Sequence, residues 1–567
     1  MLELNMYFKM PKKKYRIVFF VIGLVFVFFS FSFAKIANAS DYVNFNVDKN
    51  FEVSEKSQIS ATLVKTYPNL YFYVEKNWWE AQLPAKQSEI LAYIDALSLE
   101  FGSTIYPILT SVFGSEWNPG VDGDKRITIL FHSMKDGVGG YFRSADEHIK
   151  LQTPISNERE MLYLPIAHID NFPRLKVALA HEFVHLITFN QKDRVHGVQE
   201  EVWLNEARAD YASTILGYNN IYDSSNLAKR VKDFLEKPSD SLTEWQETKH
   251  DYGVVNVFFH YLVDHYGINI LADSLKSKLI GIASINELLL KNGYKEDFKQ
   301  IFTNWTIAMT LNYCSPDLKY CFLNKNLSNL RINPILNFLP LSGNSSLSVT
   351  NVTKNWSGNW QKIIGGNGDL KLEFESIPGL DFTVPYIIFD KDNNYSINFI
   401  QLDQKEKGEI SIKNFGSKYN SLVIMPFLHT KTSGFDGFEF TYPYTFKVSI
   451  TGAVPEEDQL VIQKLLAQID YLKKQIATLQ AGSSANSFCS LISVNLYIGV
   501  KASDQVKCLQ QFLKVQDSNI YPEGLITGYF GNLTKAAVIR FQQKYQISST
   551  GFAGVLTRAK INQLLKL

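Results

Sequence analysis

The apolar residues of this chain change their spacing along its 567 residues, and each change limits what a segment can fold into. Residues 173–310 repeat apolar side chains at helical intervals, whereas residues 341–451 alternate apolar and polar side chains between turn residues. A chain of this length exceeds one hydrophobic core. The sequence therefore predicts a multidomain protein, with an α+β domain over residues 40–335 and an all-β sandwich over residues 340–452.

A heptad pattern follows the alternating region, over residues 455–481. Its apolar positions are Ile462, Leu465, Ile469, Leu472, Ile476 and Leu479. Isoleucine at a and leucine at d favour a parallel two-stranded coiled coil, but about three heptads are marginal for independent dimerisation. A homodimer through the 462–479 seam and a single helical spacer both remain open. The sequence "GSSANS" at residues 482–487 predicts a flexible hinge.

The N-terminus has the anatomy of a secretory signal peptide, which we assign to residues 1–39. Four basic residues within 12–16 precede the uncharged, mostly apolar run at 17–33, and residues 37–39 read Ala-Asn-Ala, a small-residue cleavage site. An uncleaved anchor is the alternative, although the run is short for a membrane span. We expect an exported chain, with the membrane as a partner only if the signal stays uncleaved.

The cysteines and the charge balance fit an exported protein. Cys314 and Cys321 lie close together, and Cys489 and Cys508 both fall in the last segment. Two local disulfides suit an oxidising compartment, with the connectivity left open. The chain has 57 Lys and Arg against 56 Asp and Glu, and this near-neutral balance gives no reason to expect nucleic acid as a partner.

The stretch "ALAHEFVHLITFN" carries the first candidate site. His181 and His185 are four residues apart on a predicted helix, so both imidazoles can reach one ion. Zinc suits imidazole nitrogen and needs a third protein ligand and an open position for catalysis. Glu182 can then accept a proton from water. A helix with satisfied histidines remains the alternative for this stretch alone.

A second helical stretch, "EEVWLNEARADYAS", offers the third ligand. Glu206 and Asp210 are four residues apart and share a helix face. Glu206 can complete a His2Glu zinc site, and Asp210 can accept the far ring N–H of a ligand histidine. Either carboxylate alone would be interpreted as an ordinary solvated charge. Together with the histidine pair upstream, the two carboxylates favour a zinc site. Glu200 and Glu201 fall on a different face of this helix.

The combination of "HEFVH" with "LNEARAD" resembles the gluzincin metallopeptidases of the thermolysin-like and hyicolysin-like types. The resemblance implies a zincin-like α+β fold whose zinc helices span residues 173–216. It also implies that "GDKRITILF" and "DGVGGYFRS", within residues 120–150, are edge strands that pair with an extended substrate. The implied roles are zinc ligands for His181, His185 and Glu206, general base for Glu182 and histidine partner for Asp210.

An oxyanion-stabilising group is expected opposite the zinc, and Tyr252 is the candidate. Gluzincin aminopeptidases have a tyrosine at a similar distance before a helix end, but the glycine that usually follows three residues later is absent here. His250, His260 and His265 are rivals, and a packing role for Tyr252 is the other alternative. Because no G-x-M-E-N motif precedes the zinc helices, we expect an endopeptidase rather than an aminopeptidase.

The last segment, residues 488–567, contains "GYFGNLTKAAVIRFQ" and a shorter echo, "STGFAGVLTRAKIN". It resembles the small three-helix peptidoglycan-binding domain. We expect its glycines to make tight turns, and Thr534 and Thr557 to cap helices. A helical module that no longer binds the wall is the alternative. The resemblance gives three candidates for glycan contact, namely Tyr529, Phe530 and Gly531.

A calcium site is suggested by Asp122 and Asp124 in "NPGVDGDKR", but a turn before a strand is the better interpretation, because too few oxygen ligands are in view.

Together these patterns predict a secreted, zinc-dependent metalloendopeptidase, tethered at the cell wall or cell surface through peptidoglycan. Its protein or peptide substrate is, in order of expectation, an external protein, an envelope protein or the stem peptides of peptidoglycan. The hypothesis from another class is a catalytically inactive, wall-bound adhesion or scaffolding protein. The intact set from His181 to Asp210 argues against it.

Overall fold

The computed structural model describes residues 42–315, 317–435, 437–451, 491–501, 503–517 and 519–565, with six helical residues between 464 and 472. The chain divides into two compact units, Met1–Val454 and Pro455–Leu567, which confirms the multidomain prediction. The predicted signal peptide, the hinge and most of the heptad seam lie outside the described residues. Within the described part, no helix is long and apolar enough to cross a membrane.

The first unit opens with a six-stranded sheet in the order β1-β2-β3-β4-β6-β5. Its strands are β1 (Val43–Asn46), β2 (Gln58–Thr66), β3 (Leu70–Glu75), β4 (Ile127–His132), β5 (Tyr141–Phe142) and β6 (Met161–Pro165). The strands β3, β4 and β6 are parallel, and β5 runs antiparallel to β6 at the edge.

The position of β4 corrects the prediction of two edge strands within residues 120–150. All six residues of β4 are buried, and β3 and β6 flank it, so it is a central strand. Its unbroken apolar run is typical of a parallel strand that is covered on both faces. Only β5 lies at the edge, and β6 separates it from β4.

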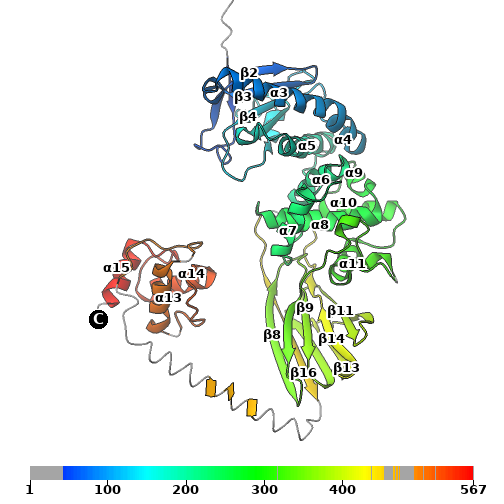
Figure 1. Cartoon of the computed structure of the whole chain (residues 1–567), viewed down its shortest axis with the longest axis vertical. Coiled ribbons are helices and arrows are strands. Elements are labelled where there is room, and N and C mark those ends of the chain that lie inside the picture. The colour runs from blue at the N-terminus through cyan, green and yellow to red at the C-terminus, as the bar shows by residue number, and fades with distance from the viewer. Residues whose placement is uncertain are drawn as a thin grey trace, which may run out of the picture. The chain divides into compact units, whose positions relative to one another are not determined.

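Some helices lie between β3 and β4 in the chain and the others follow β6. The helices within residues 202–311 lie between this sheet and the strands that follow residue 334 (Figure 1). The α-helices are α2 (Lys76–Glu80), α3 (Pro84–Glu100), α4 (Tyr106–Phe113), α5 (Phe172–Thr188), α6 (Val202–Ile215), α7 (Asn226–Glu236), α8 (Lys249–Tyr266), α9 (Asn269–Ser274), α10 (Gly281–Lys291) and α11 (Phe298–Leu311). Short helical turns are η1 (Phe101–Ile105), η2 (Ser144–Glu147), η3 (Ile166–His168), η4 (Phe189–Arg194), η5 (Leu318–Tyr320) and η6 (Lys325–Leu327).

The alternating region forms the ten strands β7 (Ile335–Leu339), β8 (Ser345–Thr353), β9 (Gln361–Gly365), β10 (Gly368–Ser376), β11 (Phe382–Asp390), β12 (Tyr395–Ile400), β13 (Lys407–Phe415), β14 (Tyr419–Ile424), β15 (Phe427–Leu428) and β16 (Tyr442–Thr451). Pairing gives two layers, β12-β11-β14-β9-β7 and β13-β10-β16-β8, joined between β13 and β14 by the single pair Phe415 and Tyr419. Alternate residues of both layers share one apolar core, as a sandwich requires.

This sandwich also shares a core with the helices. Trp356, Trp360 and Phe427 belong to the same buried cluster as the residues of α5, α8 and α11. The indole of Trp360 donates to the carbonyl of Thr306 at 2.9 Å, and the backbone N–H of Leu242 donates to the carbonyl of Trp356 at 2.9 Å. The sandwich is therefore packed into the helical part rather than joined to it by a linker.

The second unit contains the helices α13 (Asp504–Gln516), α14 (Asn532–Lys544) and α15 (Val555–Leu564) around a small core, which confirms the predicted helical C-terminal domain. The prediction that Thr534 and Thr557 are helix caps is wrong. The helices α14 and α15 begin after Gly531 and Gly554, and the two threonines lie inside the first turn.

A disulfide joins Cys314 to Cys321, which is one of the local pairings that the sequence left open. Cys508 is also disulfide-bonded, whereas Cys489 lies outside the described residues.

Candidate functional site

The two helices that carry the candidate metal ligands pack against each other in the core of the first unit. The helix α5 begins at Asn171, whose side chain accepts from the N–H of Arg174 at 3.2 Å. Leu179, Phe183 and Leu186 of this helix are fully buried. Because α5 is covered on most sides, its two histidines are held in fixed places, and α6 brings its glutamate opposite them.

The ligand atoms of His181, His185 and Glu206 lie within 4.8 Å of one another. The two histidine Nε2 atoms are 3.2 Å apart. Glu206 Oε2 is 3.2 Å from His181 Nε2, and Glu206 Oε1 is 3.5 Å from His185 Nε2. Among the described residues this is the one group of at least three His, Cys, Asp or Glu side chains with such convergence.

The cluster places the buried negative charge of Glu206 beside two imidazoles. Burial alone would lower the pKa of His181, but its contact with the Glu206 carboxylate raises that pKa to about 9. Burial lowers the pKa of His185. Burial opposes ionisation of Glu206, yet the charges of the two histidines hold its pKa below the ordinary value. A cation between these three side chains would therefore meet an ionised carboxylate.

The predicted base, Glu182, lies under the edge strand. Its side chain is 5% exposed, and burial raises its pKa to about 8. A Cβ atom added to Gly140, just before β5, would fall 2.9 Å from Glu182 Oε1 and 2.9 Å from the carbonyl oxygen of Tyr163. The absence of a side chain at Gly140 thus lets the edge strand pass directly over the carboxylate.

Tyr252 is the only one of the four oxyanion candidates that the structure brings to the cluster. Its ring centroid lies 6.4 Å from that of His181. Burial raises the pKa of the Tyr252 hydroxyl, and the negative charges of Glu206 and Glu182 raise it further. A capping box of Thr248 and Asp251 starts the helix α8 just before it.

The three rival histidines are engaged elsewhere. His250 faces Glu236, with 3.7 Å between Nε2 and the carboxylate. His260 contacts the hydroxyl of Thr214 at 2.9 Å, and His265 contacts the carbonyl of Cys321 at 2.9 Å. None of them faces the candidate metal ligands in the described structure.

Asp210 does not make the hydrogen bond to a ligand histidine that the resemblance implies. Its carboxylate accepts from Arg230 Nη2 at 2.9 Å, Asn226 Nδ2 at 3.0 Å and Asn256 Nδ2 at 2.5 Å. Burial would raise its pKa, but Arg230 holds that pKa below the ordinary value. Asp210 therefore acts on His181 only as a nearby charge, because its oxygens already have partners.

Sequence reasoning missed Arg230 and Gly140. The guanidinium of Arg230 lies 4.3 Å from the ring centroid of Tyr252, so it links Asp210 to the oxyanion candidate. Its helix, α7, carries no motif that marks it, whereas the "GG" before β5 was a usable signal for close backbone approach. Glu200 pairs with Arg208 at 2.8 Å, and Glu201 accepts from the Trp203 indole, so both lie outside the cluster.

In the second unit, two matching turns precede α14 and α15. The side-chain amide of Gln510 donates to Tyr529 O and Thr534 Oγ1, and Gln542 repeats this with Phe552 O and Thr557 Oγ1. These turns are therefore built by glutamines from the preceding helices.

The three candidate glycan contacts differ in exposure. Tyr529 is 44% exposed, whereas Phe530 is fully buried in the small core, so it cannot contact a glycan as predicted. Gly531 precedes the first turn of α14 and is half-buried.

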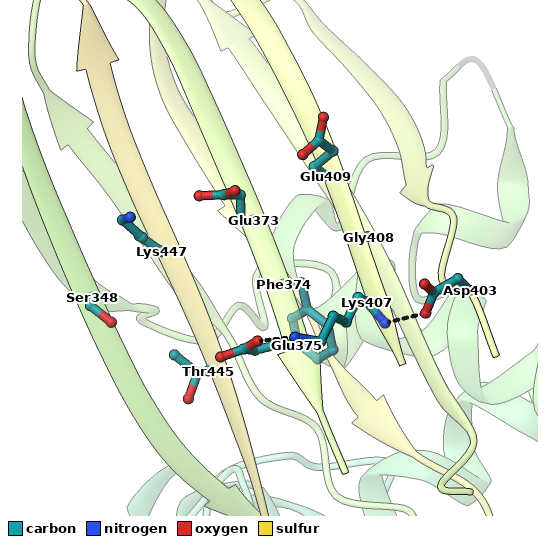
Figure 2. Close-up of a pocket in the computed structure, with 10 residues that line it drawn as sticks. All are labelled: Ser348, Glu373, Phe374, Glu375, Asp403, Lys407, Gly408, Glu409, Thr445 and Lys447. Carbon is teal, nitrogen blue, oxygen red and sulfur yellow. Dashed lines mark hydrogen bonds and ion pairs between the residues drawn. The ribbon is translucent and has the colours of Figure 1, made fainter. Parts of the chain in front are cut away.

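A polar hollow of about 440 Å³ lies on the outer face of the β13-β10-β16-β8 layer (Figure 2). Its charges are largely paired with one another. Lys407 contacts Glu375 at 2.8 Å, and Lys371 contacts Glu373 at 3.0 Å and Glu409 at 2.8 Å. These exposed pairs carry no converging set of free ligands, so we assign this face no site.

Comparison with known proteins identifies one part of the chain. Residues 502–561 match the family model described as "Putative peptidoglycan binding domain". Over these residues the C-terminal helical unit is similar to that family. No curated protein matches the chain.

Solved structures match about a fifth of the chain at low similarity. The Yersinia pseudotuberculosis-derived mitogen is 11% identical, with 20% of this chain and 92% of that one covered and a TM-score of 0.14. The pre-peptidase C-terminal domain of a Bacillus anthracis collagenase is 10% identical, with 20% and 96% covered and a TM-score of 0.14. A family 11 carbohydrate-binding module from Clostridium thermocellum is 9% identical, with 21% and 92% covered and a TM-score of 0.13. No function follows from scores this low.

Proposed function

We propose that the chain is an exported zinc-dependent endopeptidase that its C-terminal unit holds at peptidoglycan. The observation that carries the proposal is the convergence of His181, His185 and Glu206, with their ligand atoms within 4.8 Å, beside the buried carboxylate of Glu182. Two imidazoles, one carboxylate and an adjacent base are the protein groups that a hydrolytic zinc site requires.

The residues present fit a zinc ion. Two Nε2 atoms face each other at 3.2 Å, and Glu206 Oε2 is buried without a hydrogen-bond partner. Nitrogen and carboxylate oxygen are ligands that zinc accepts. Because ligands bind metal in their deprotonated form, zinc binding would compete with the proton that Glu206 stabilises on His181.

A bound zinc ion would supply Lewis acidity and would lower the pKa of water at the site. Glu182 then accepts the proton of the attacking water and later delivers it to the leaving amine. Burial raises the pKa of Glu182 to about 8 in the metal-free site, and the positive charge of a bound zinc ion would lower it again, so that the carboxylate is available as a base near neutral pH. Tyr252 donates its hydroxyl proton in a hydrogen bond to the oxyanion.

Substrate binding follows from the edge strand. β5 pairs only with β6 in the described structure, so its other side is free to pair with an extended peptide. Gly140 holds this edge over Glu182, which would bring the bound backbone beside the base. An extended peptide on both sides of the site is the binding mode of an endopeptidase.

The C-terminal unit adds a second binding activity, to peptidoglycan. The match of residues 502–561 to the family model supports it. Tyr529 is the exposed aromatic of the first turn and Phe552 that of the matching second turn, at 44% and 41% exposure. Attachment to the wall raises the local concentration of the catalytic unit there, for protein substrates and stem peptides alike.

The test is cleavage of an unfolded protein such as casein by the zinc-loaded chain, beside Glu182→Gln. This variant keeps the side-chain shape and removes the base, so we expect a loss of at least about 100-fold in activity with the zinc content unchanged. Exposed Glu80 on α2 offers the matched control, and Glu80→Gln should retain activity. Removal of zinc by a chelator should abolish cleavage, and added zinc should restore it.

Three outcomes would change this proposal. Equal background in wild type and Glu182→Gln with a full zinc complement, on both casein and purified peptidoglycan, would favour a binding protein over a peptidase. Absence of stoichiometric zinc in the wild type would reject the metal centre itself. Release of stem peptides without casein cleavage would make peptidoglycan the substrate.

A further inference from the structure

A second group of carboxylates lies away from the candidate zinc site, below the turn that precedes β4. Glu147 comes from η2, and Glu160 lies just before β6. One oxygen of Glu160 accepts from the backbone N–H of Val121 at 2.7 Å. The turn closes over this carboxylate, since a Cβ atom at Gly120 would fall 1.8 Å from Glu160 Oε2.

In the described structure, no donor group reaches either oxygen of Glu147, and its close polar neighbour is the second carboxyl group, Glu160. The side chain of Glu147 is 1% exposed, and both of its carboxylate oxygens are buried without a donor, as is Oε2 of Glu160. The adjacent Asp146 is equally buried, but it accepts from Tyr163 at 2.5 Å and from the N–H of Asn157 at 2.8 Å. The same segment thus satisfies one buried carboxylate and leaves its neighbour unsatisfied.

No basic side chain compensates the pair. Within the described part of the chain, neither Glu147 nor Glu160 forms an ion pair with a lysine or an arginine, and Asp122 on the covering turn adds negative charge. Burial and then the charge of Glu160 raise the pKa of Glu147, and burial raises the pKa of Glu160 to about 7. Buried carboxylates without partners are costly unless a cation binds them.

We propose that Glu147 and Glu160 bind a calcium ion, with Asp122 as a nearby negative charge. The ligand atoms that the two glutamates offer are all oxygens, the donor type that calcium prefers. Calcium accepts bidentate carboxylates, backbone carbonyls and water in irregular geometry, whereas magnesium demands a near-octahedral set. The three carboxylate oxygens that no donor reaches would supply about half of such a shell.

The ion has a path to this site. Glu147 lines a cavity of about 480 Å³, whose wall also includes Val121, His148, Phe189 and Asp193. Since η2 follows β5 directly in the chain, calcium there would hold the edge strand and the turn before β4 together. The sequence did not predict this site, because the "NPGVDGDKR" turn has too few oxygen ligands of its own. The other ligand oxygens come from two other segments of the chain. The proposal does not depend on peptidase activity.

The test is calcium binding by the full chain, dialysed into calcium-free buffer. Isothermal titration should find one calcium ion per chain at this site. Calcium at up to roughly 10 mM should raise the Tm of the first unit by about 5 °C, and magnesium should raise it less. Glu147→Gln and Glu160→Gln should each abolish this binding and the rise in Tm. Glu158→Gln, an exposed change in the same segment, should keep both.

A different result identifies the alternative. If the two glutamates share a proton, calcium leaves the wild-type Tm unchanged and Glu147→Gln raises it at neutral pH, which would overturn the proposal. Should the variants fail to fold, absence of calcium binding by the wild type would overturn it equally.

Discussion

Replacement of Gly140 by alanine tests whether the edge strand and the base must fit against each other. The new Cβ atom would lie 2.9 Å from Glu182 Oε1 and 2.9 Å from Tyr163 O, whereas ordinary contacts begin at 3.4 Å. The strand or the carboxylate must therefore move by roughly 0.5 Å. Because Tyr163 belongs to β6, in the core of the sheet, we expect Glu182 and the β5 edge to shift instead.

A misplacement of about 1 Å at a reacting group costs about 100-fold in rate, so Gly140→Ala should reduce kcat/KM by roughly 10- to 100-fold. This is a loss of about 1.4–2.7 kcal/mol in transition-state stabilisation. The zinc content should stay the same, because none of the ligands moves.

The assay is peptide hydrolysis by the zinc-loaded chain, with Gly139→Ala as the matched control. A Cβ atom at Gly139 would meet no atom within 4 Å, so this variant should keep wild-type kcat/KM. Full activity of Gly140→Ala would refute the contact between strand and base. An equal loss in both variants would show that loop flexibility, rather than this contact, limits the rate.

Two further predictions concern stability. Burial lowers the pKa of His132, His260 and His429 to about 4, below the value of about 6.5 in the unfolded chain, so the unfolded state takes up protons first as the pH falls. The contribution of these histidines to stability is therefore complete above about pH 6.5 and is lost between about pH 6.5 and 4, at about 1.4 kcal/mol per pH unit per histidine. Urea denaturation at several pH values, with the wild type beside His429→Gln, would measure it as a difference between the two profiles, and parallel profiles would contradict it. Gln510→Ala should leave the N–H groups of Thr527 and Gly528 unpaired and lower the stability of the C-terminal unit by about 2 kcal/mol, which calorimetry would detect as a shift of that transition alone. Gln511→Ala, an exposed change on the same helix, should leave the transition unchanged.

The sequence predicted the elements that local periodicity determines. The helices around His181 and Glu206 follow from apolar spacing and the i to i+4 geometry, so the convergence of their side chains could be anticipated. The sandwich followed from strict alternation between turns. These predictions depend on neighbours along the chain, which is why they needed no knowledge of tertiary packing.

Interactions between distant segments were missed or assigned wrongly. Whether β4 lies at an edge depends on β6, which comes about 30 residues later in the chain and pairs beside it. The residues of β4 itself indicate a central strand only through their uniform burial. The partners of Asp210 come from α7 and α8, and no spacing rule connects these helices to it. Phe530 looked like a surface aromatic in a glycine-rich turn, but the turn folds it inward.

The shared core of the helices and the sandwich constrains how this protein can be rearranged. Trp356 and Trp360 come from the sandwich region, yet they are buried against Phe298, Phe302 and Trp305 of α11. A recombination event that cuts the gene between α11 and β7 would leave an apolar surface on each product. An exchange that keeps this core intact therefore has to carry the helical part and the sandwich together.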